Sequence, residues 1–157
     1  MGKILILLLF LTACSNQKEE IVNEYYILTE EDLFSEEQLI EEIKMYNFKY
    51  PHIILAQAIL ESGNFTSNVF ESHNNMFGMK IAKSRITCAQ KDVGDYAYYN
   101  DWKMSLVDRA LYETTYLRKS KSEDDYLKVM CASYAEDVEY RIKLQKVVDI
   151  RELKSKF

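Results

Sequence analysis

An almost wholly apolar run from Pro51 to Ser62 is the feature that most constrains how this chain can fold. A helix that is apolar on every side is one that neighbouring elements surround. Pro51 suits the first turn of such a helix, because it lacks only an amide that would be unpaired there anyway. Gly63 supplies the stop. The run therefore predicts a buried central helix around which the other elements pack.

Composition narrows the fold and the partners further. Only 4 Gly and 1 Pro occur among 157 residues, which is too few turn formers for a sandwich or barrel of many short strands. The length gives room for a single domain. The formal charge of −5 argues against a protein that binds nucleic acid phosphates, and the 48% hydrophobic residues are enough for a packed core.

The rest of the chain reads mainly as helices. Ser35 to Gln38 is a capping-box pattern, which predicts a helix ending near Asn47. Further helices are expected over residues 67–73, after Asp101, from Ser122, and over about 138–150. Residues 79–82 and 96–99 are short and β-friendly, and predict a small hairpin or an irregular lobe. The fold class predicted is α+β, mostly α, with a short β-lobe.

The N-terminus reads as an export signal. Lys3 precedes an apolar run over residues 4–11, far shorter than the ~20 residues of a membrane-spanning helix. The run ends in Leu-Thr-Ala-Cys, which resembles a bacterial lipobox whose Cys14 is acylated. We expect a signal peptide over 1–13, a lipid-anchored cysteine and polar tether over 14–34, and a folded domain over 35–157. An ordinary cleaved signal and a short buried element are the alternatives.

This interpretation sets expectations for compartment, cysteines and cofactors. The protein is expected in the cell envelope, anchored as a periplasmic or outer-membrane lipoprotein, and monomeric. An exported compartment permits a disulfide between Cys88 and Cys131, although two separate thiols are favoured. The chain shows no metal-ligand spacing and no phosphate-binding glycine loop, so neither a metal nor a cofactor is predicted.

Glu61 lies where a structural residue is least expected, at the end of the most apolar segment. Apolar surroundings raise the pKa of a carboxyl group, and such a group acts as a general acid near neutral pH. Cleavage of a glycosidic bond needs that kind of proton donor. The alternative, a Glu61 exposed past the helix end or paired with a basic residue, is favoured by periodicity alone.

Four segments of the chain change that balance. They are Ala56–Gly63 (AQAILESG), Asn74–Lys80 (NNMFGMK), Tyr99–Ser105 (YNDWKMS) and Ser133–Tyr140 (SYAEDVEY). In this order they resemble the motifs of bacterial glucosaminidase domains, which belong to glycoside hydrolase family seventy-three, found in flagellar peptidoglycan hydrolases and autolysins.

The resemblance implies a lysozyme-like fold and hydrolysis of the β-1,4 bond after N-acetylglucosamine in the glycan strands of peptidoglycan. It implies that Glu61 is the catalytic acid and that Tyr134 lies near the reacting sugar. Phe77 and Gly78 match the floor of the groove. A muramidase or lytic transglycosylase on the same fold, or an inactive lipoprotein that only binds glycan, are the competing functions.

The chain departs from the family pattern at its second carboxylate. Many members carry another Glu some thirty residues after the first, yet no Glu occurs here between Glu71 and Glu113. Asp95 is the nearest substitute in position. Three mechanisms stay open: Asp95 activates water, the substrate's own N-acetyl group attacks, or Tyr134 stabilises the developing charge.

The remaining candidates are expected to bind substrate. Gln57 lies one helical turn before Glu61 and could orient it. Asn75 is expected to contact an acetamido group. Tyr96 and Tyr98 could stack on sugar rings, although core packing is the alternative for one of them.

Overall fold

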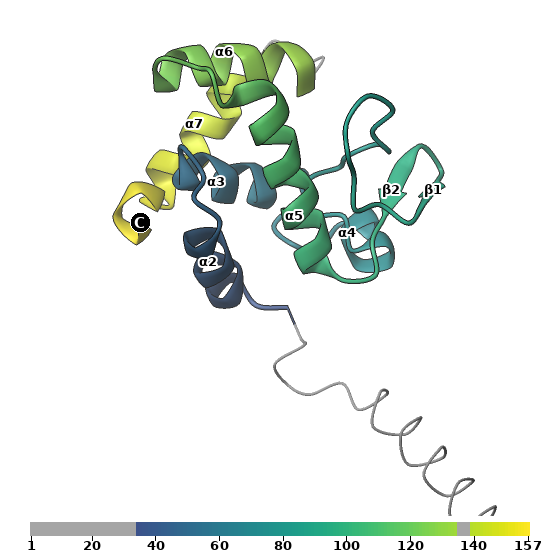
Figure 1. The fold of residues 1–157 in the computed structure, drawn as a ribbon. Helices are drawn as coiled ribbons and strands as arrows, with labels where there is room; N and C mark the ends of the chain where they lie inside the picture. Colours follow the sequence, from purple (N-terminus) through teal and green to yellow (C-terminus); the bar gives the residue numbers. More distant parts are fainter. Residues whose placement is uncertain (1–33, 135–138) are drawn as a thin grey trace, which may run out of the picture. The chain divides into compact units, whose positions relative to one another are not determined.

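In the computed structural model the described residues are 34–134 and 139–157, without the side chains of 133 and 134 (Figure 1). The chain divides into two units, 1–34 and 35–157, and every described helix and strand belongs to the second. The predicted signal peptide, Cys14 and nearly all of the tether lie outside the described residues. Among the residues that are described, no helix has the length and apolarity needed to cross a membrane.

The predicted central helix is confirmed as α3, Pro51–Glu61. Its residues 53–59 are all buried. Three elements pack against it: α2 (Glu36–Met45), α7 (Tyr140–Ile150) and the 3-10 turn η3 (Leu153–Lys156). The capping box at the start of α2 is present in both directions, because Ser35 and Gln38 exchange hydrogen bonds of 3.1 Å. The apolar run thus forms the buried central helix that its composition predicts.

The other predicted helices are also present. They are α4 (Asn68–His73), α5 (Trp102–Tyr112) and α6 (Glu123–Tyr134). The side chain of Asp101 caps α5, as expected, by accepting from the amide of Met104. Helix α5 continues into a π-helical turn, η2 (Glu113–Leu117), which the sequence pattern did not indicate. Such turns are rare and often occur near functional sites.

The β-lobe is a two-stranded antiparallel hairpin of β1 (Lys91–Val93) and β2 (Tyr96–Tyr98). Gly94 and Asp95 form its turn, both with positive φ, as a tight two-residue hairpin turn requires.

A small hairpin or an irregular lobe was expected from residues 79–82 and 96–99. The hairpin instead pairs β2 with β1, and residues 79–82 form no strand. Only one backbone hydrogen bond, from the Ala97 amide to the Met79 carbonyl at 2.8 Å, joins that segment to β2. The amide of the Asn75 side chain donates to the same carbonyl. The segment is therefore held as a loop. The fold class, α+β and mostly α, is confirmed.

Cys88 and Cys131 are both free thiols. The favoured interpretation, two separate cysteines, is confirmed.

Candidate active site

Glu61 is the last residue of α3 and its side chain is half-buried. Its carboxyl group faces Gly78, where a β-carbon would stand 3.4 Å from Oε2. Gly78 also has a positive φ of 61°, so both its backbone and its missing side chain suit this close approach. The chain folds so that the second glycosidase-like motif covers the acid of the first.

Burial raises the pKa of Glu61 above its ordinary value, while the hydroxyl group of Tyr140 lowers it in part. Tyr140 is the first residue of α7 and is buried. Burial and then the charge of Glu61 raise the pKa of this phenol in turn. The two groups interact, yet the Tyr140 hydroxyl makes no hydrogen bond of normal geometry within the described part of the chain. Glu61 and Tyr140 are therefore close together, but no hydrogen bond of normal geometry joins them.

Gln57 lies fully buried behind the same pair. Its Oε1 accepts a 2.8 Å hydrogen bond from Nε of Arg109, on α5. Its Nε2 makes no hydrogen bond with any described residue, although the Gln57 amide is close enough to Tyr140 to lower the pKa of that phenol. Gln57 therefore supports the acid from inside the protein and does not reach the surface.

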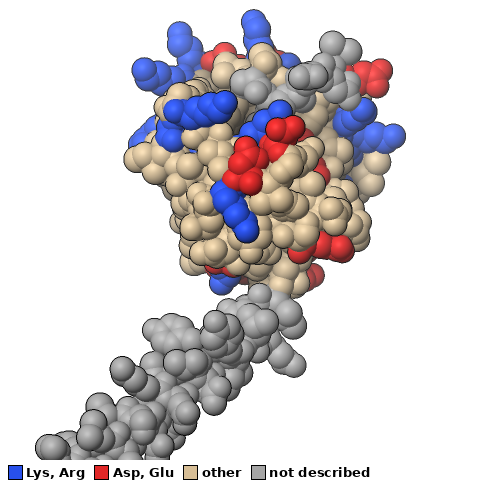
Figure 2. Space-filling model, turned by 90° about the vertical axis from the view of Figure 1, so that its right-hand side faces the viewer, with Lys and Arg blue, Asp and Glu red and all other residues tan. Residues whose placement is uncertain are grey.

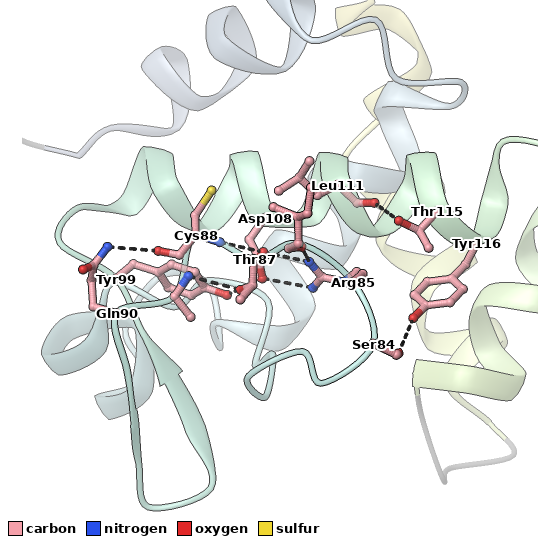
Figure 3. Close-up of polar contacts among 12 residues, drawn as sticks. Ser84, Arg85, Thr87, Cys88, Gln90, Tyr99, Asp108, Leu111, Thr115 and Tyr116 are labelled. Atoms are coloured by element: carbon pink, nitrogen blue, oxygen red, sulfur yellow. Dashed lines mark hydrogen bonds and ion pairs between the residues drawn. The ribbon is translucent and has the colours of Figure 1, made fainter.

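Gly78, the residue that the Glu61 carboxyl group faces, also lines a cleft of about 340 Å³. One wall of this cleft is the loop over residues 78–85, and the other wall is Tyr112 and Tyr116, at the end of α5 and in η2. Ser84 and Tyr116 join the two walls through a 3.0 Å hydrogen bond between their hydroxyl groups (Figure 3). Gly78 is thus the residue that links Glu61 to the cleft.

Asp108 holds the cleft loop on α5 (Figure 3). Its buried carboxylate accepts two hydrogen bonds from Arg85, at 2.8 and 3.0 Å, one from the Tyr99 hydroxyl at 2.8 Å, and one from the Cys88 amide at 3.1 Å. Burial alone would raise the pKa of Asp108, but Arg85 and Tyr99 outweigh burial and lower it. One wall of the cleft is thus fixed by a fully bonded carboxylate.

Asn75 and Phe77, predicted to contact substrate, are in the interior. Asn75 is 1% exposed, and its amide bonds the backbone of Met79 and Ala97 at 2.8 to 3.0 Å. Phe77 is 0% exposed. Both side chains shape the turn that presents Gly78, and neither offers a surface to a sugar.

Asp95, Tyr96 and Tyr98 belong to the hairpin. Asp95 is exposed in its turn, and no described interaction joins it to Glu61. Tyr96 is 37% exposed, and the ring of Tyr98 lies under the ammonium group of Lys91 at 4.6 Å. In the view of Figure 1, α5 lies between α3 and the hairpin. The described contacts therefore do not bring Asp95 together with Glu61.

Tyr134 is the last residue of α6, but its side chain is outside the described part of the structure. Its role beside the reacting sugar stays a prediction. The tyrosine that does face Glu61 is Tyr140, which sequence reasoning missed. The signal was available, because Tyr140 is the closing residue of the fourth family-like segment.

The described surface and side chains bear on two other kinds of ligand, a charged partner and a metal ion. Figure 2 shows that Lys and Arg lie interspersed with Asp and Glu among uncharged residues over the middle of one face. No three His, Cys, Asp or Glu side chains gather as a metal site would need, as far as the chain is described. His52 pairs with Glu123 at 3.4 Å, at the opposite end of α3 from Glu61.

Comparison with known proteins gives a family match and a match among solved structures. The glucosaminidase family, described as mannosyl-glycoprotein endo-beta-N-acetylglucosaminidase, matches residues 36–153. Among solved structures, the catalytic domain of the autolysin Auto from Listeria monocytogenes matches with a TM-score of 0.53 at 22% sequence identity. The match covers 89% of this chain and 97% of that one, and it shows a shared fold. A comparison with curated proteins gives no significant match.

Proposed function

The chain belongs to the glucosaminidase family of glycoside hydrolases, and from that premise we propose that it cleaves the β-1,4 bond after N-acetylglucosamine in peptidoglycan. The observation that carries this proposal is the half-buried carboxyl group of Glu61, which lies against Gly78 of the cleft and has its pKa raised by burial. A raised pKa keeps a carboxyl group protonated and able to donate near neutral pH. The shared fold with an autolysin supports a cell-wall substrate.

Glu61 acts first as the general acid. It gives its proton to the oxygen of the scissile bond as that bond breaks and positive charge develops on the sugar. The carboxylate that remains needs a donor, and the hydroxyl group of Tyr140 is beside it. The same carboxylate can then remove a proton from the incoming water.

The second group is best supplied by the substrate. Among the described residues only Tyr140 perturbs Glu61, and Asp95 is exposed in the turn of the hairpin. Attack of the N-acetyl oxygen on the anomeric carbon needs no second carboxylate, a route that some glycosidases use. The cyclic intermediate opens when water attacks the same carbon. This route predicts retained stereochemistry, with Tyr134 as a further support for the developing charge.

Location at the cell envelope is the second part of the proposal. The lipobox-like sequence ending at Cys14 supports export and a lipid anchor, and a peptidoglycan substrate requires action outside the cytoplasm. An acyl chain contributes about 0.8 kcal/mol for each buried methylene. The polar residues up to 34 would then separate the enzyme from the membrane.

The test is digestion of purified peptidoglycan by wild type, Glu61→Gln and Glu71→Gln. Glu71 is an exposed carboxylate on α4, so its variant is the matched control. We expect Glu61→Gln to lose activity by about 10³-fold, as removal of a general acid does, and to keep its circular dichroism spectrum. The control should digest at the wild-type rate.

Mass spectrometry of the released fragments identifies the bond. Reducing ends of N-acetylglucosamine support the proposal, whereas N-acetylmuramic acid or anhydro ends would identify a muramidase or a lytic transglycosylase. A folded Glu61→Gln variant with wild-type activity would overturn the role of Glu61. No digestion by wild type would favour a protein that only binds glycan.

A further inference from the structure

A buried cation lies behind the catalytic acid. Arg109, on α5, is 0% exposed, and a buried charge needs partners. Besides its bond to Gln57, it donates from Nη2 to the hydroxyl group of Tyr126, on α6, at 3.0 Å. The Tyr126 hydroxyl in turn donates to Glu113, on η2, at 2.5 Å, and Glu113 stands 3.9 Å from Nη1 of Arg109. The cation is thus balanced by Glu113 on the side away from Glu61.

The chemistry of Arg109 decides which way the Gln57 amide points. A guanidinium group has five donors and no acceptor, so Gln57 must present its oxygen to Arg109. The 2.8 Å bond from Nε to Oε1 has that polarity. The NH₂ end of Gln57 is then the end available to the Tyr140 hydroxyl, which is beside it. A hydrogen bond donated by this NH₂ group to Tyr140 would leave the phenol proton for another acceptor.

From this polarity we propose that Arg109 is a positioning residue for the catalytic acid: by fixing the orientation of the Gln57 amide, it makes the Tyr140 hydroxyl a hydrogen-bond donor to Glu61. The inference rests on the proposed role of Glu61 as general acid. The Arg109-to-Gln57 hydrogen bond is in place, and in the proposed series Gln57 then donates to Tyr140 and Tyr140 donates to Glu61 once Glu61 carries its charge. Hydrogen bonds aligned in one direction polarise one another, so the last donor is strengthened.

We call the series Arg109, Gln57 and Tyr140 the relay. It acts on the charged form of Glu61. Once the proton has gone to the leaving oxygen, the Tyr140 hydroxyl stabilises the carboxylate. Without Arg109 the Gln57 amide can turn over and present its oxygen to Tyr140, which then donates to Gln57. Glu61 loses its donor, its pKa rises, and the reaction slows because the carboxylate product of proton transfer is less stable.

Few ionisable groups stand near Glu61 in the part of the chain that the structure describes. Those that face it from packed elements are Tyr140 on α7 and, one side chain further in, Arg109 on α5. Arg109 has Tyr126 and Glu113 around it. His52 is at the other end of α3. A shift in the pH profile of a relay variant would therefore report on Glu61 itself.

The first test variant removes the cation together with its counter-ion. Loss of Arg109 alone would leave the buried charge of Glu113 without its cation and could unfold the protein. The variant is therefore Arg109→Met with Glu113→Gln, in the full chain. The glutamine in that variant can still accept from the Lys49 amide, as Glu113 does at 2.8 Å. Glu113→Gln alone is the matched control, because Arg109 keeps its bond to Gln57.

The second test variant is Gln57→Glu, which keeps the shape of the side chain and a partner for Arg109. The carboxylate in this variant accepts hydrogen bonds at both oxygens, so the Tyr140 hydroxyl donates its hydrogen bond to residue 57 and not to Glu61. It reverses the relay without removing any element of it. If the double variant fails to fold, Gln57→Glu still decides the question.

We expect both test variants to fold, and kcat to fall about 10-fold, the size of one lost hydrogen bond to a charged group. KM should stay within about twofold, since no residue of the relay reaches the cleft surface. The alkaline limb of the pH profile should move to higher pH, because Glu61 loses its donor. Arg109→Lys, which keeps a cationic donor, should recover most of kcat.

A folded test variant with wild-type kcat and an unmoved pH profile would overturn the proposal. So would a loss confined to KM, or a kcat loss in the Glu113→Gln control as large as in the double variant. These outcomes leave Glu61 as the acid. Failure of the proposed function itself is recognised separately, by an active Glu61→Gln enzyme.

Discussion

The domain contains two buried polar clusters that differ in how completely they are bonded. Around Asp108 both carboxylate oxygens are used by Arg85, Tyr99 and the Cys88 amide. Around Glu61, two buried polar atoms, Nε2 of Gln57 and the hydroxyl oxygen of Tyr140, make no hydrogen bond with described residues. Buried polar atoms are almost always bonded, so the second cluster holds donors in reserve. The Asp108 cluster therefore stabilises the fold, whereas the Glu61 cluster has donors that can bind the carboxylate when Glu61 loses its proton.

Adjacent residues of α5 serve the two clusters. Asp108 faces the cleft loop, and Arg109 faces Gln57 and the interior. Successive residues on a helix point about 100° apart, which lets one helix support both. The carboxylate at 108 is in its charged form with its partners around it, whereas the cation at 109 acts on Glu61 through two neutral side chains.

The largest effect on stability is expected for Asp108→Asn. Arg85 is 4% exposed in its side chain and would be left buried with only a neutral partner. We expect the free energy of unfolding to fall by about 3–5 kcal/mol, measured by urea denaturation at pH 7. Asp124→Asn is the control, because Asp124 pairs with Arg141 at 2.6 Å on the surface, where such pairs contribute about 0–1 kcal/mol.

The pH dependence of the same variant is a second readout. The pKa of Asp108 is lowered in the folded protein, so its contribution is present above the ordinary pKa and lost as pH falls through the lowered one. Wild type and variant should therefore converge in strong acid. Equal losses for Asp108→Asn and Asp124→Asn would show that the cluster does not hold the fold.

Tyr140→Phe should separate activity from stability. The substitution removes a buried hydroxyl group that has no hydrogen bond of normal geometry, so the free energy of unfolding should change by less than about 1 kcal/mol. Activity should fall about 10-fold, because the Glu61 carboxylate loses its donor. Thermal unfolding and peptidoglycan digestion measure the two.

The control for that experiment is Tyr126→Phe. The Tyr126 hydroxyl accepts from Arg109 and donates to Glu113, both in the interior. Its loss leaves two buried groups short of a partner and should lower stability by about 1–3 kcal/mol. If Tyr140→Phe destabilised the protein as much as Tyr126→Phe does, the contrast between bonded and reserve groups would be wrong.

Local patterns predicted much of this molecule. The apolar run at 51–62 is the central helix, the capping box at Ser35 begins α2, and Glu61 is at the end of α3. Each depends on residues close together in the sequence, where spacing determines which side chains meet. The β-lobe was predicted to exist, but residues 79–82 were expected in it in place of strand 91–93, because β-propensity does not report which carbonyl groups are already taken by Asn75.

Long-range pairings could not be predicted in this way. Gln57 and Arg109 are 52 positions apart, and Asp108 and Arg85 are 23 apart. No spacing rule joins them, because the packing of whole helices sets these contacts. Asn75 was expected to bind sugar because the sequence shows the motif that contains it. The sequence does not show the packing that buries its side chain.

The smallest effect sharpens the comparison most, because it has the opposite sign. The pKa of Glu61 is raised in the folded protein, so the native state holds that proton more tightly than the unfolded chain does. Its contribution to stability is fully present below the ordinary pKa of 4.5 and is lost as pH rises through the raised value. Asp108 behaves in the reverse direction, since its pKa is lowered.

Glu61→Gln should therefore be as stable as wild type near pH 4 and more stable at pH 8, by a few degrees in Tm at about 2–4 °C per kcal/mol. Glutamine has no proton to lose, so the variant is spared the cost of a buried negative charge at high pH. Thermal unfolding at a series of pH values measures the difference, with Glu71→Gln as the exposed control. A Glu61→Gln variant that loses stability relative to wild type as pH rises would mean that the Glu61 carboxylate is bonded as fully as that of Asp108, and that burial does not raise the pKa of Glu61.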